Sequence, residues 1–178
     1  MKNSCKLLCM AAGFALLFGS NLLAADNNQY FGAGKGTIDS PYWVENAEQL
    51  KNVRLFPNSF FIQTTDIDVG DSEFLPIGDF EKPFTGFYDG EGHKITIGNL
   101  CATNGNIRLA GVWGFASEAD IRNLNVEVTA SLELDGRVCL GGIAACANKT
   151  SITNCSVSSD SNLQVTSEKC LYAGGIVG

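Results

Sequence analysis

The sequence has few of the residues from which most metal and catalytic centres are built. His93 is its single histidine and no two cysteines have the C-x-x-C spacing, so a histidine cluster is excluded and a zinc site is disfavoured. A Ser-His-Asp triad is formally open to His93, but DGEGHKI is typical of a turn before a strand and favours a surface histidine. We therefore expect no catalytic residue, no metal site and no cofactor.

Positive charge is also scarce, with 12 Lys and Arg against 19 Asp and Glu and a net charge of −7. An acidic surface repels phosphate groups, which argues against nucleic acid and anionic lipid as partners and favours solubility. Glycans or proteins of a host or matrix remain as candidate partners, and the sequence does not choose between them.

No uninterrupted apolar run reaches the ~20 residues that a membrane-spanning helix needs. Residues 1–25 begin with Lys2 and Lys6, continue with LLCMAAGFALLFGSNLLA and end in small residues. This layout predicts a secretory signal peptide and an exported mature chain, residues 26–178. The expected location is extracellular or at the bacterial cell surface, with outer-membrane-associated and periplasmic locations left open.

The glycine-rich segment FGAGKGT, residues 31–37, resembles a phosphate-binding loop. Aligned on its Gly-Lys pair, that motif requires glycine where Gln29 stands and Ser or Thr where Gly36 stands. No apolar strand precedes the segment, and Ser40-Pro41 disfavours the helix that would have to follow. We therefore expect no nucleotide site, but a turn that leads into the first strand.

A repeat runs through the second half of the chain. GVWGFASEADIRNLNV, from Gly111, aligns without a gap on GIAACANKTSITNCSV, from Gly142, at a constant offset of 31. YAGGIVG restarts the unit at Gly175, and residues 84–100 contain a shorter copy. Repeats at a fixed period of about 25–31 residues, here over 84–178, indicate a solenoid after an N-terminal cap region at 26–83. The sequence ends inside a repeat, which predicts a further C-terminal portion.

Apolar residues alternate with polar ones inside each repeat, as in NLNVEV and ITIGNL, and this period of two predicts short strands. The fold class expected is all-β, a parallel β-helix whose turns stack at ~4.8 Å. Gly111, Gly142 and Gly175 would lie where the chain bends and a Cβ has no room. The predicted side-chain ladder consists of Asn99, Asn123 and Asn154.

ENAEQLKNV, residues 45–53, departs from this alternation. Ala47, Leu50 and Val53 are spaced by three, and Asn46 is placed to cap the N-terminus of a helix. A short amphipathic helix here would protect the first turn of the solenoid.

The ordered series of motifs resembles a known family. GKGTIDSPYWVENAEQLKNV, FFIQTTDIDV, FLPIG and PFTGFYDGEGHKI, followed by IRNLNV, ITNCSV and AGGIVG, is similar to bacterial surface proteins with GLUG repeats. The resemblance implies a right-handed parallel β-helix in an adhesin-like protein or in the non-catalytic part of a secreted IgA-type metallopeptidase. Trp113 replaces the usual Leu or Phe, and Ala144-Ala145-Cys146 replaces the apolar-Gly end of the repeat.

Five cysteines follow the predicted signal peptide. Cys139 and Cys170 are one repeat apart, so stacking would bring their Cα atoms near the ~5.5 Å of a disulfide. An exported chain would retain such a bond. The alternative is that all five are small buried hydrophobic residues.

Two further sites were considered, and both are less favoured than structural roles. DIDVGDSE, residues 66–73, is acidic but lacks the order of a calcium-binding loop, which favours a solvated turn. Parallel β-helix enzymes group Asp, Lys and Arg on one face, whereas no shared groove is evident for the basic residues. These are Arg108, Arg122, Arg137, Lys149 and Lys169.

The sequence thus predicts a secreted or cell-surface module with a structural or adhesin-like binding role and no catalysis of its own. The alternatives are a carbohydrate-active enzyme on a β-helix and a non-catalytic part of a larger secreted hydrolase.

Overall fold

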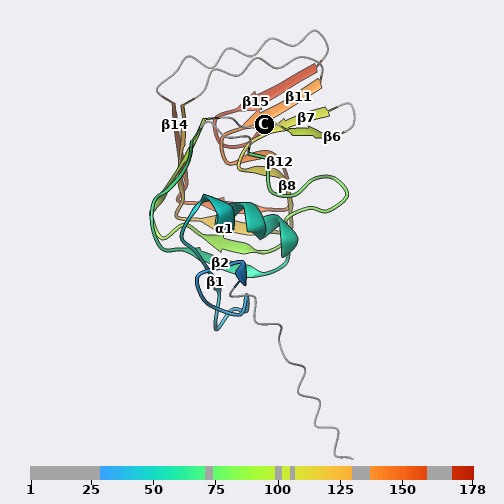
Figure 1. Cartoon of the computed structure of the whole chain (residues 1–178). Coiled ribbons are helices and arrows are strands. Elements are labelled where there is room, and N and C mark those ends of the chain that lie inside the picture. The colour runs from blue at the N-terminus through green and yellow to red at the C-terminus, as the bar shows by residue number, and fades with distance from the viewer. Residues whose placement is uncertain (1–28, 71–73, 99–101, 105–106, 130–136, 160–169) are drawn as a thin grey trace, which may run out of the picture.

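The computed structural model describes residues 29–70, 74–98, 102–104, 107–129, 137–159 and 170–178 (Figure 1). The predicted signal peptide therefore lies outside the described residues. One short helix, α1 (Ala47–Asn52), continues into a 3-10 turn, Val53–Leu55. The strands are β1 (Tyr42–Val44), β2 (Phe60–Gln63), β3 (Ile67–Gly70), β4 (Phe87–Asp89), β5 (Lys94–Ile97), β6 (Ala102–Asn104), β7 (Ile107–Ala110), β8 (Trp113–Ser117), β9 (Asp120–Arg122), β10 (Asn125–Val128), β11 (Arg137–Gly141), β12 (Ala144–Asn148), β13 (Ser151–Thr153), β14 (Ser156–Ser159) and β15 (Cys170–Gly174).

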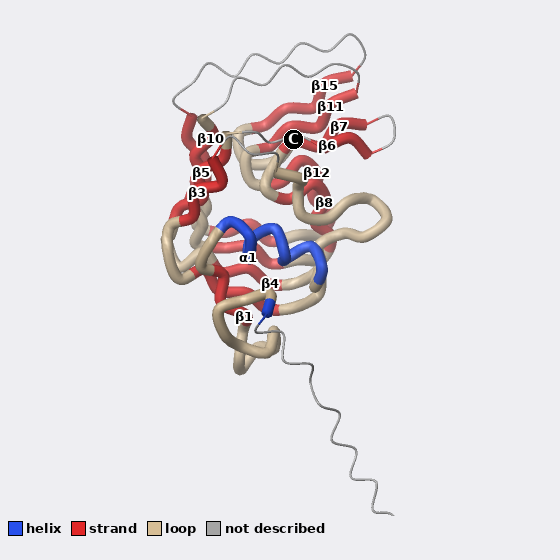
Figure 2. The backbone as a smooth tube through the Cα atoms, in the orientation of Figure 1, coloured by secondary structure: helices blue, strands red, loops and turns tan. Residues whose placement is uncertain are grey.

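The strands form four sheets whose neighbours come from distant parts of the chain. The orders are β1-β2-β4-β9-β13, β14-β10-β5-β3, β15-β11-β7-β6 and β12-β8. Among the described strands, β6 and β7 form the antiparallel pair, and the other paired strands run parallel. Figure 2 shows these strands side by side, with the helix across one side of them. The all-β class and the parallel pairing are confirmed.

The sequence repeat is visible as strand register. Trp113 lies beside Ala144, Ile121 beside Ile152 and Val126 beside Val157, each pair at the predicted offset. Equivalent positions therefore lie side by side, and their inward side chains pack against each other from one turn to the next.

The earlier, shorter copy has a different register from the one expected. Phe87 pairs with Asp120 at an offset of 33, whereas Ile95 pairs with Val126 at an offset of 31. Two additional residues are accommodated in the turn 90–93, between β4 and β5, where Glu91 and Gly92 have positive φ. Gly86-Phe87 resembles the Gly-apolar pair that starts the later repeats at Gly111 and Gly142, but the register shows that this match of letters is not a match in space.

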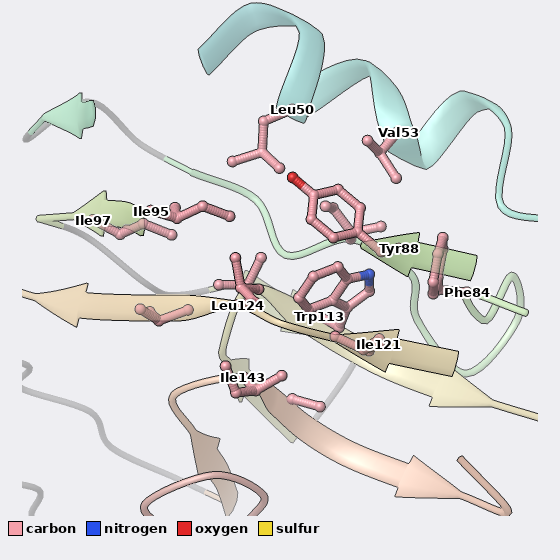
Figure 3. Packing of buried hydrophobic residues seen from close by; sticks show 14 of the residues in the cluster. Leu50, Val53, Phe84, Tyr88, Ile95, Ile97, Trp113, Ile121, Leu124 and Ile143 are labelled. Carbon is pink, nitrogen blue, oxygen red and sulfur yellow. The ribbon is translucent and has the colours of Figure 1, made fainter. Parts of the chain in front are cut away.

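Aromatic rings fill the interior at the N-terminal end of the stack. Phe31 stacks on Tyr42 with ring centroids 4.5 Å apart, and Tyr88 meets Trp113 edge-on at 5.1 Å. Figure 3 shows Tyr88 and Trp113 between the helix and the strands, with Leu50 pointing toward Tyr88. These side chains are almost completely buried, and such large rings contribute much apolar area to the core.

The predicted helix is confirmed together with its cap. Asn46 Oδ1 accepts a hydrogen bond from the backbone N–H of Gln49 at 3.0 Å, and Leu50 and Val53 are fully buried. Because α1 contacts β3, the helix covers the interior beside the first strands.

The glycine-rich segment forms the turn expected before the first strand. The Gly32 N–H donates to the Trp43 carbonyl at 3.1 Å, and the Lys35 N–H donates to the Ser40 carbonyl at 2.8 Å. Gly34 has φ +92°, and a Cβ there would lie 1.8 Å from the Pro41 carbonyl oxygen. The N–H groups of Gly32 and Lys35 are thus engaged by backbone carbonyls of residues 40–43 and are not free to bind a phosphate.

Gly111 and Gly142 have the close-approach role predicted for the repeat glycines, whereas Gly175 does not. A Cβ on Gly111 would lie 2.6 Å from the Gly141 carbonyl oxygen, and one on Gly142 would lie 2.4 Å from Val157 Cγ1. The Gly142 N–H donates to the Gly175 carbonyl at 3.0 Å. Around Gly175, no atom lies within 4 Å of a Cβ position among the residues that the structure places.

The predicted side-chain ladder is present between Asn123 and Asn154. Asn154 Nδ2 donates to Asn123 Oδ1 at 2.8 Å, and both residues have φ +52°. The next partner of Asn123 is Asp89, whose Oδ1 accepts from Asn123 Nδ2 at 2.9 Å. Asn99, the third predicted member, lies outside the described residues.

The expected stacking of Cys139 on Cys170 is also wrong. Cys170 pairs with Arg137, and Tyr172 lies beside Cys139, whose thiol is free. The connection 160–169 is two residues longer than the equivalent connection 129–136, which shifts the register of β15 by two. The thiol that Cys139 contacts belongs to Cys146, and burial together with this contact raises the Cys146 pKa to about 12.

Candidate binding groove

The five-stranded sheet carries two outward rows of side chains that cross its strands. One row consists of Phe60, Phe87, Asp120 and Ser151, and the other of Trp43, Ile62, Asp89, Arg122 and Thr153. Between them, the inward row runs from Tyr42 through Tyr88 to Ile152. Because alternate residues of a strand face opposite sides, the residues that fill the core also fix which side chains reach the outer face.

A groove of about 680 Å³ lies over this outer face. It is lined by Ile38, Pro41, Asn58, Phe60, Ile62, Thr85, Gly86, Phe87, Asp89, Glu91, Glu118, Asp120 and Arg122. Such a volume is in the range of small-ligand sites, which are concave and mostly apolar with a few polar groups that orient the ligand.

One half of the groove is apolar. Phe60 of β2 and Phe87 of β4 are neighbours across the strands, with ring centroids 5.7 Å apart. Ile38 lies at the margin with 73% of its surface exposed. A row of exposed rings and aliphatic groups offers a ligand a hydrophobic contact face.

The other half is charged and is organised by a buried ion pair. Arg122 Nε donates to Asp89 Oδ2 at 2.8 Å, and the Asp89 side chain is 6% exposed. Asp89 Oδ1 also accepts from Asn123 Nδ2 and from the backbone N–H of Glu91 at 3.0 Å. The Arg122 guanidinium lies over the Phe87 ring, 4.5 Å from its centroid, and so joins the two halves.

These contacts determine the charge state of the pair. Burial raises the Asp89 pKa, but the hydrogen bonds from Asn123, the Glu91 backbone and Arg122 outweigh it, so the net shift is downward. The hydrogen bond to Asp89 raises the pKa of Arg122. Both groups are therefore ionised at neutral pH.

Acidic side chains at the margin complete the groove. Glu91 and Asp120 both lie close enough to Arg122 to raise its pKa electrostatically, in addition to Asp89. Glu118 lies at a corner with φ +55° and meets Lys149 Nζ at 3.4 Å. One arginine thus faces three carboxylates, and the groove has an excess of negative charge.

This arrangement corrects one sequence-based expectation. Arg122 shares a groove with acidic partners, and Lys149 pairs with Glu118 at its margin, although no such grouping was expected. The signal in the sequence was the outward position in consecutive strands: Phe60 and Ile62, then Phe87 and Asp89. These segments fall at unequal spacings, so the repeat did not align them.

The other sequence-derived candidates lie elsewhere. His93 is partly exposed, with Nδ1 3.2 Å from Asp66 Oδ1, at the approach to β3 and β5. A hydrogen bond from the Lys94 backbone, followed by the contact with His93, lowers the Asp66 pKa. The acidic run continues into β3, where Asp68 Oδ1 accepts from the Gly70 N–H at 2.8 Å, and its last residues, 71–73, lie outside the described ranges.

In the described part of the chain, no three His, Cys, Asp or Glu side chains gather closely enough to hold a metal ion. No helix of that part has the length and apolar character to cross a membrane.

Fold and groove together define an all-β protein with stacked parallel strands and an aromatic and acidic outer face. No family model and no solved structure matches the chain. A protein of Evansella cellulosilytica described as a "Putative Gly-rich membrane protein" is 34% identical over 109 residues. The match covers 56% of this chain and 12% of that protein, so the chain spans a small part of the length of its relative.

Proposed function

We propose that this chain is an exported binding module built on a right-handed parallel β-helix of the kind found in bacterial GLUG-repeat surface proteins. Its role is adhesive or structural, without catalysis of its own, and the groove over the five-stranded sheet is its ligand site. The observation that carries the proposal is the pair of outward rows on parallel strands, which form one continuous concave face.

The parallel registers support the β-helix. Segments one repeat apart lie side by side in three sheets, as successive turns of a solenoid would. Gly111 and Gly142 allow close contact with neighbouring chain segments, and Asn123 and Asn154 are hydrogen-bonded to each other. Both features lie at corners between strands, where successive turns of a solenoid must fit together. The relative described as a membrane protein agrees with a location at the cell envelope.

The charge state of Asp89 argues against its use as a catalytic acid. Cleavage of a glycosidic bond by two carboxyl groups requires one that is protonated at working pH and donates its proton to the leaving oxygen. The Asp89 pKa is lowered, and its oxygens already accept three hydrogen bonds. Asp89 therefore holds Arg122 in place and does not supply that proton.

A carbohydrate-active enzyme is the second candidate function. The observation in its favour is that Asp120 lies beside Arg122 in a groove with exposed aromatic rings. Release of reducing ends or unsaturated sugars from a panel of neutral and acidic polysaccharides would establish this function in place of a purely binding role.

The proposal is tested by binding to arrays of glycans and extracellular-matrix proteins with the purified chain. We expect retention of at least one ligand class and its loss in Phe60→Ala, since Phe60 is half-buried on the outer face. Tyr172→Ala, which changes an exposed aromatic residue on β15, in another sheet and outside the groove lining, is the matched control. Equal retention of all three proteins would exclude the groove as the ligand site.

A further inference from the structure

We propose that the ligand of this groove is a short cationic polypeptide segment in which Lys or Arg alternates with apolar residues. The inference rests on the proposed function, because it names the ligand class of the same groove. It follows from the distribution of charge and apolar surface over β2, β4 and β9.

The charge balance selects a cation. Four carboxylates line the groove, those of Asp89, Glu91, Glu118 and Asp120, against the single guanidinium of Arg122. Asp89 is committed to Arg122 by the 2.8 Å ion pair, and Lys149 offsets Glu118 from outside the groove lining. Glu91 and Asp120 then share the cation Arg122, which is already paired with Asp89. An ammonium or guanidinium group of a ligand would therefore be attracted by both carboxylates without having to displace a strong ion pair.

The same balance opposes anionic ligands. A sulfated or uronic-acid polymer would bring negative charge to the four carboxylates, and it would have to share the single guanidinium of Arg122 with Asp89. Arg122 also covers one face of the Phe87 ring, which leaves Phe60 and Ile62 as the open apolar surface. The ligand must therefore present apolar groups within reach of its cations.

The dimensions fit a peptide of three or four residues. The apolar half lies on β2 and the acidic half on β9, two strand spacings of ~4.8 Å apart. An extended chain directs successive side chains to opposite sides, so a peptide that lies along β4 directs one set of side chains toward β2 and the other toward β9. A peptide of alternating Lys and Leu would place a Leu on Phe60 and a Lys beside Asp120.

The test uses fluorescence anisotropy of a labelled acetyl-Lys-Leu-Lys-Leu amide with the full chain. We expect it to bind at least tenfold more tightly than the Gln-Leu-Gln-Leu peptide, and its affinity to fall about fivefold or more between 50 and 500 mM NaCl, since salt screens exposed charges. Asp120→Asn is expected to weaken binding about three- to tenfold, because one attractive charge is removed while the side-chain volume is kept.

Glu81→Gln removes one carboxylate from an exposed loop outside the groove and serves as the matched control, which we expect to leave binding unchanged. Thermal melting of both variants verifies that they fold as the unmodified chain does. Equal binding of the Lys and Gln peptides, or equal losses in Asp120→Asn and Glu81→Gln, would overturn the proposal.

Two further outcomes separate this inference from the proposed function. In the first, a neutral glycan or a glucosamine oligomer binds, Phe60→Ala abolishes this binding, and the peptide does not bind. The inference of a peptide ligand is then wrong, but the groove remains a binding site. If neither peptide nor glycan responds to Phe60→Ala or Asp120→Asn, both proposals fail.

Discussion

In the first part of the chain, residues 29–98, the interior is filled with aromatic rings, whereas in the paired segments 111–128 and 142–159 it contains mainly Ile, Val and Ala. Trp113 lies where the two regions meet: it contacts Phe84 and Tyr88 on one side, and Ala144 lies beside it on the other. Aromatic rings of different shape can pack in an arrangement that occurs at one place in the core. A side chain in a repeat, however, must pack against the equivalent side chain of the next turn. Small and β-branched residues satisfy that condition at every turn.

The two regions also differ in their polar contacts. In the aromatic region, buried polar groups are bonded individually, as where the Tyr88 hydroxyl donates to Gln63 Oε1 at 3.0 Å. In the repeats, equivalent residues bond each other, as Asn154 bonds Asn123. Four substitutions distinguish these two modes of stabilisation.

Trp113→Ala is expected to have the largest effect, a loss of about 3–5 kcal/mol in the free energy of unfolding, because it leaves a large cavity between the regions. Trp43→Ala is the matched control: Trp43 is 46% exposed, and we expect a loss of about 1 kcal/mol or less. Guanidinium unfolding followed by circular dichroism measures both. Similar losses in the two variants would contradict the placement of Trp113 at the centre of the core.

Asp89→Asn should cost about 2 kcal/mol at pH 7, because an almost fully buried carboxylate loses its charged bond with Arg122. The folded-state pKa is lowered, so this stabilisation is present above the unfolded-state pKa of ~3.9 and is lost as pH falls through the folded value. The stabilities of the two proteins should therefore converge below about pH 4. A difference that persists unchanged at pH 2 would disprove the role of the ionised carboxylate.

Gly142→Ala should cost about 1–2 kcal/mol, since the new Cβ meets Val157 Cγ1 and the Gly175 carbonyl oxygen. Gly175→Ala occupies the equivalent place in the next turn but meets no described atom, so a change within about 0.5 kcal/mol is expected. Thermal unfolding of the two variants makes the comparison, and equal shifts would contradict the close-approach role of Gly142.

Asn154→Ala should have the smallest effect, about 1 kcal/mol, because the bond to Asn123 is lost and because Ala tolerates the left-handed conformation at φ +52° less well than Asn does. Asn154→Gly removes the bond but relieves the strain, so we expect it to be more stable than the Ala variant. Urea unfolding at neutral pH gives the free energies of unfolding of the two variants and shows which is more stable. An Ala variant at least as stable as the Gly variant would show that the left-handed conformation carries no cost here.

Sequence reasoning succeeded where structure repeats at constant length. Gly111 and Gly142, like Asn123 and Asn154, keep the same offset in the sequence, so alignment of the letters also aligned the residues in space. The helix at 47–52 was predictable because its cap and its buried positions are all local in sequence.

It failed where a connection changes length. The connection 160–169 has ten residues, whereas the equivalent connection 129–136 has eight, so Cys170 lies beside Arg137 and not beside Cys139. The sequences of the strands themselves do not indicate this shift. The groove was missed for a related reason. Phe60, Phe87 and Asp120 share one outward row but are different residue types at unequal spacings, so no repeated letter marks them.

The turn 90–93 absorbs two residues while the strands on either side keep their partners in β9 and β10. The backbone of this corner is held by the next turn: the Gly92 N–H donates to the Asn123 carbonyl at 2.7 Å, and the Gly92 carbonyl accepts from Asn125 Nδ2 at 2.8 Å. The side chain of Glu91, in contrast, is exposed and borders the groove that we propose as the ligand site. For protein engineering, exchange of this side chain would change the margin of the groove while the backbone that joins β4 to β5 keeps its hydrogen bonds.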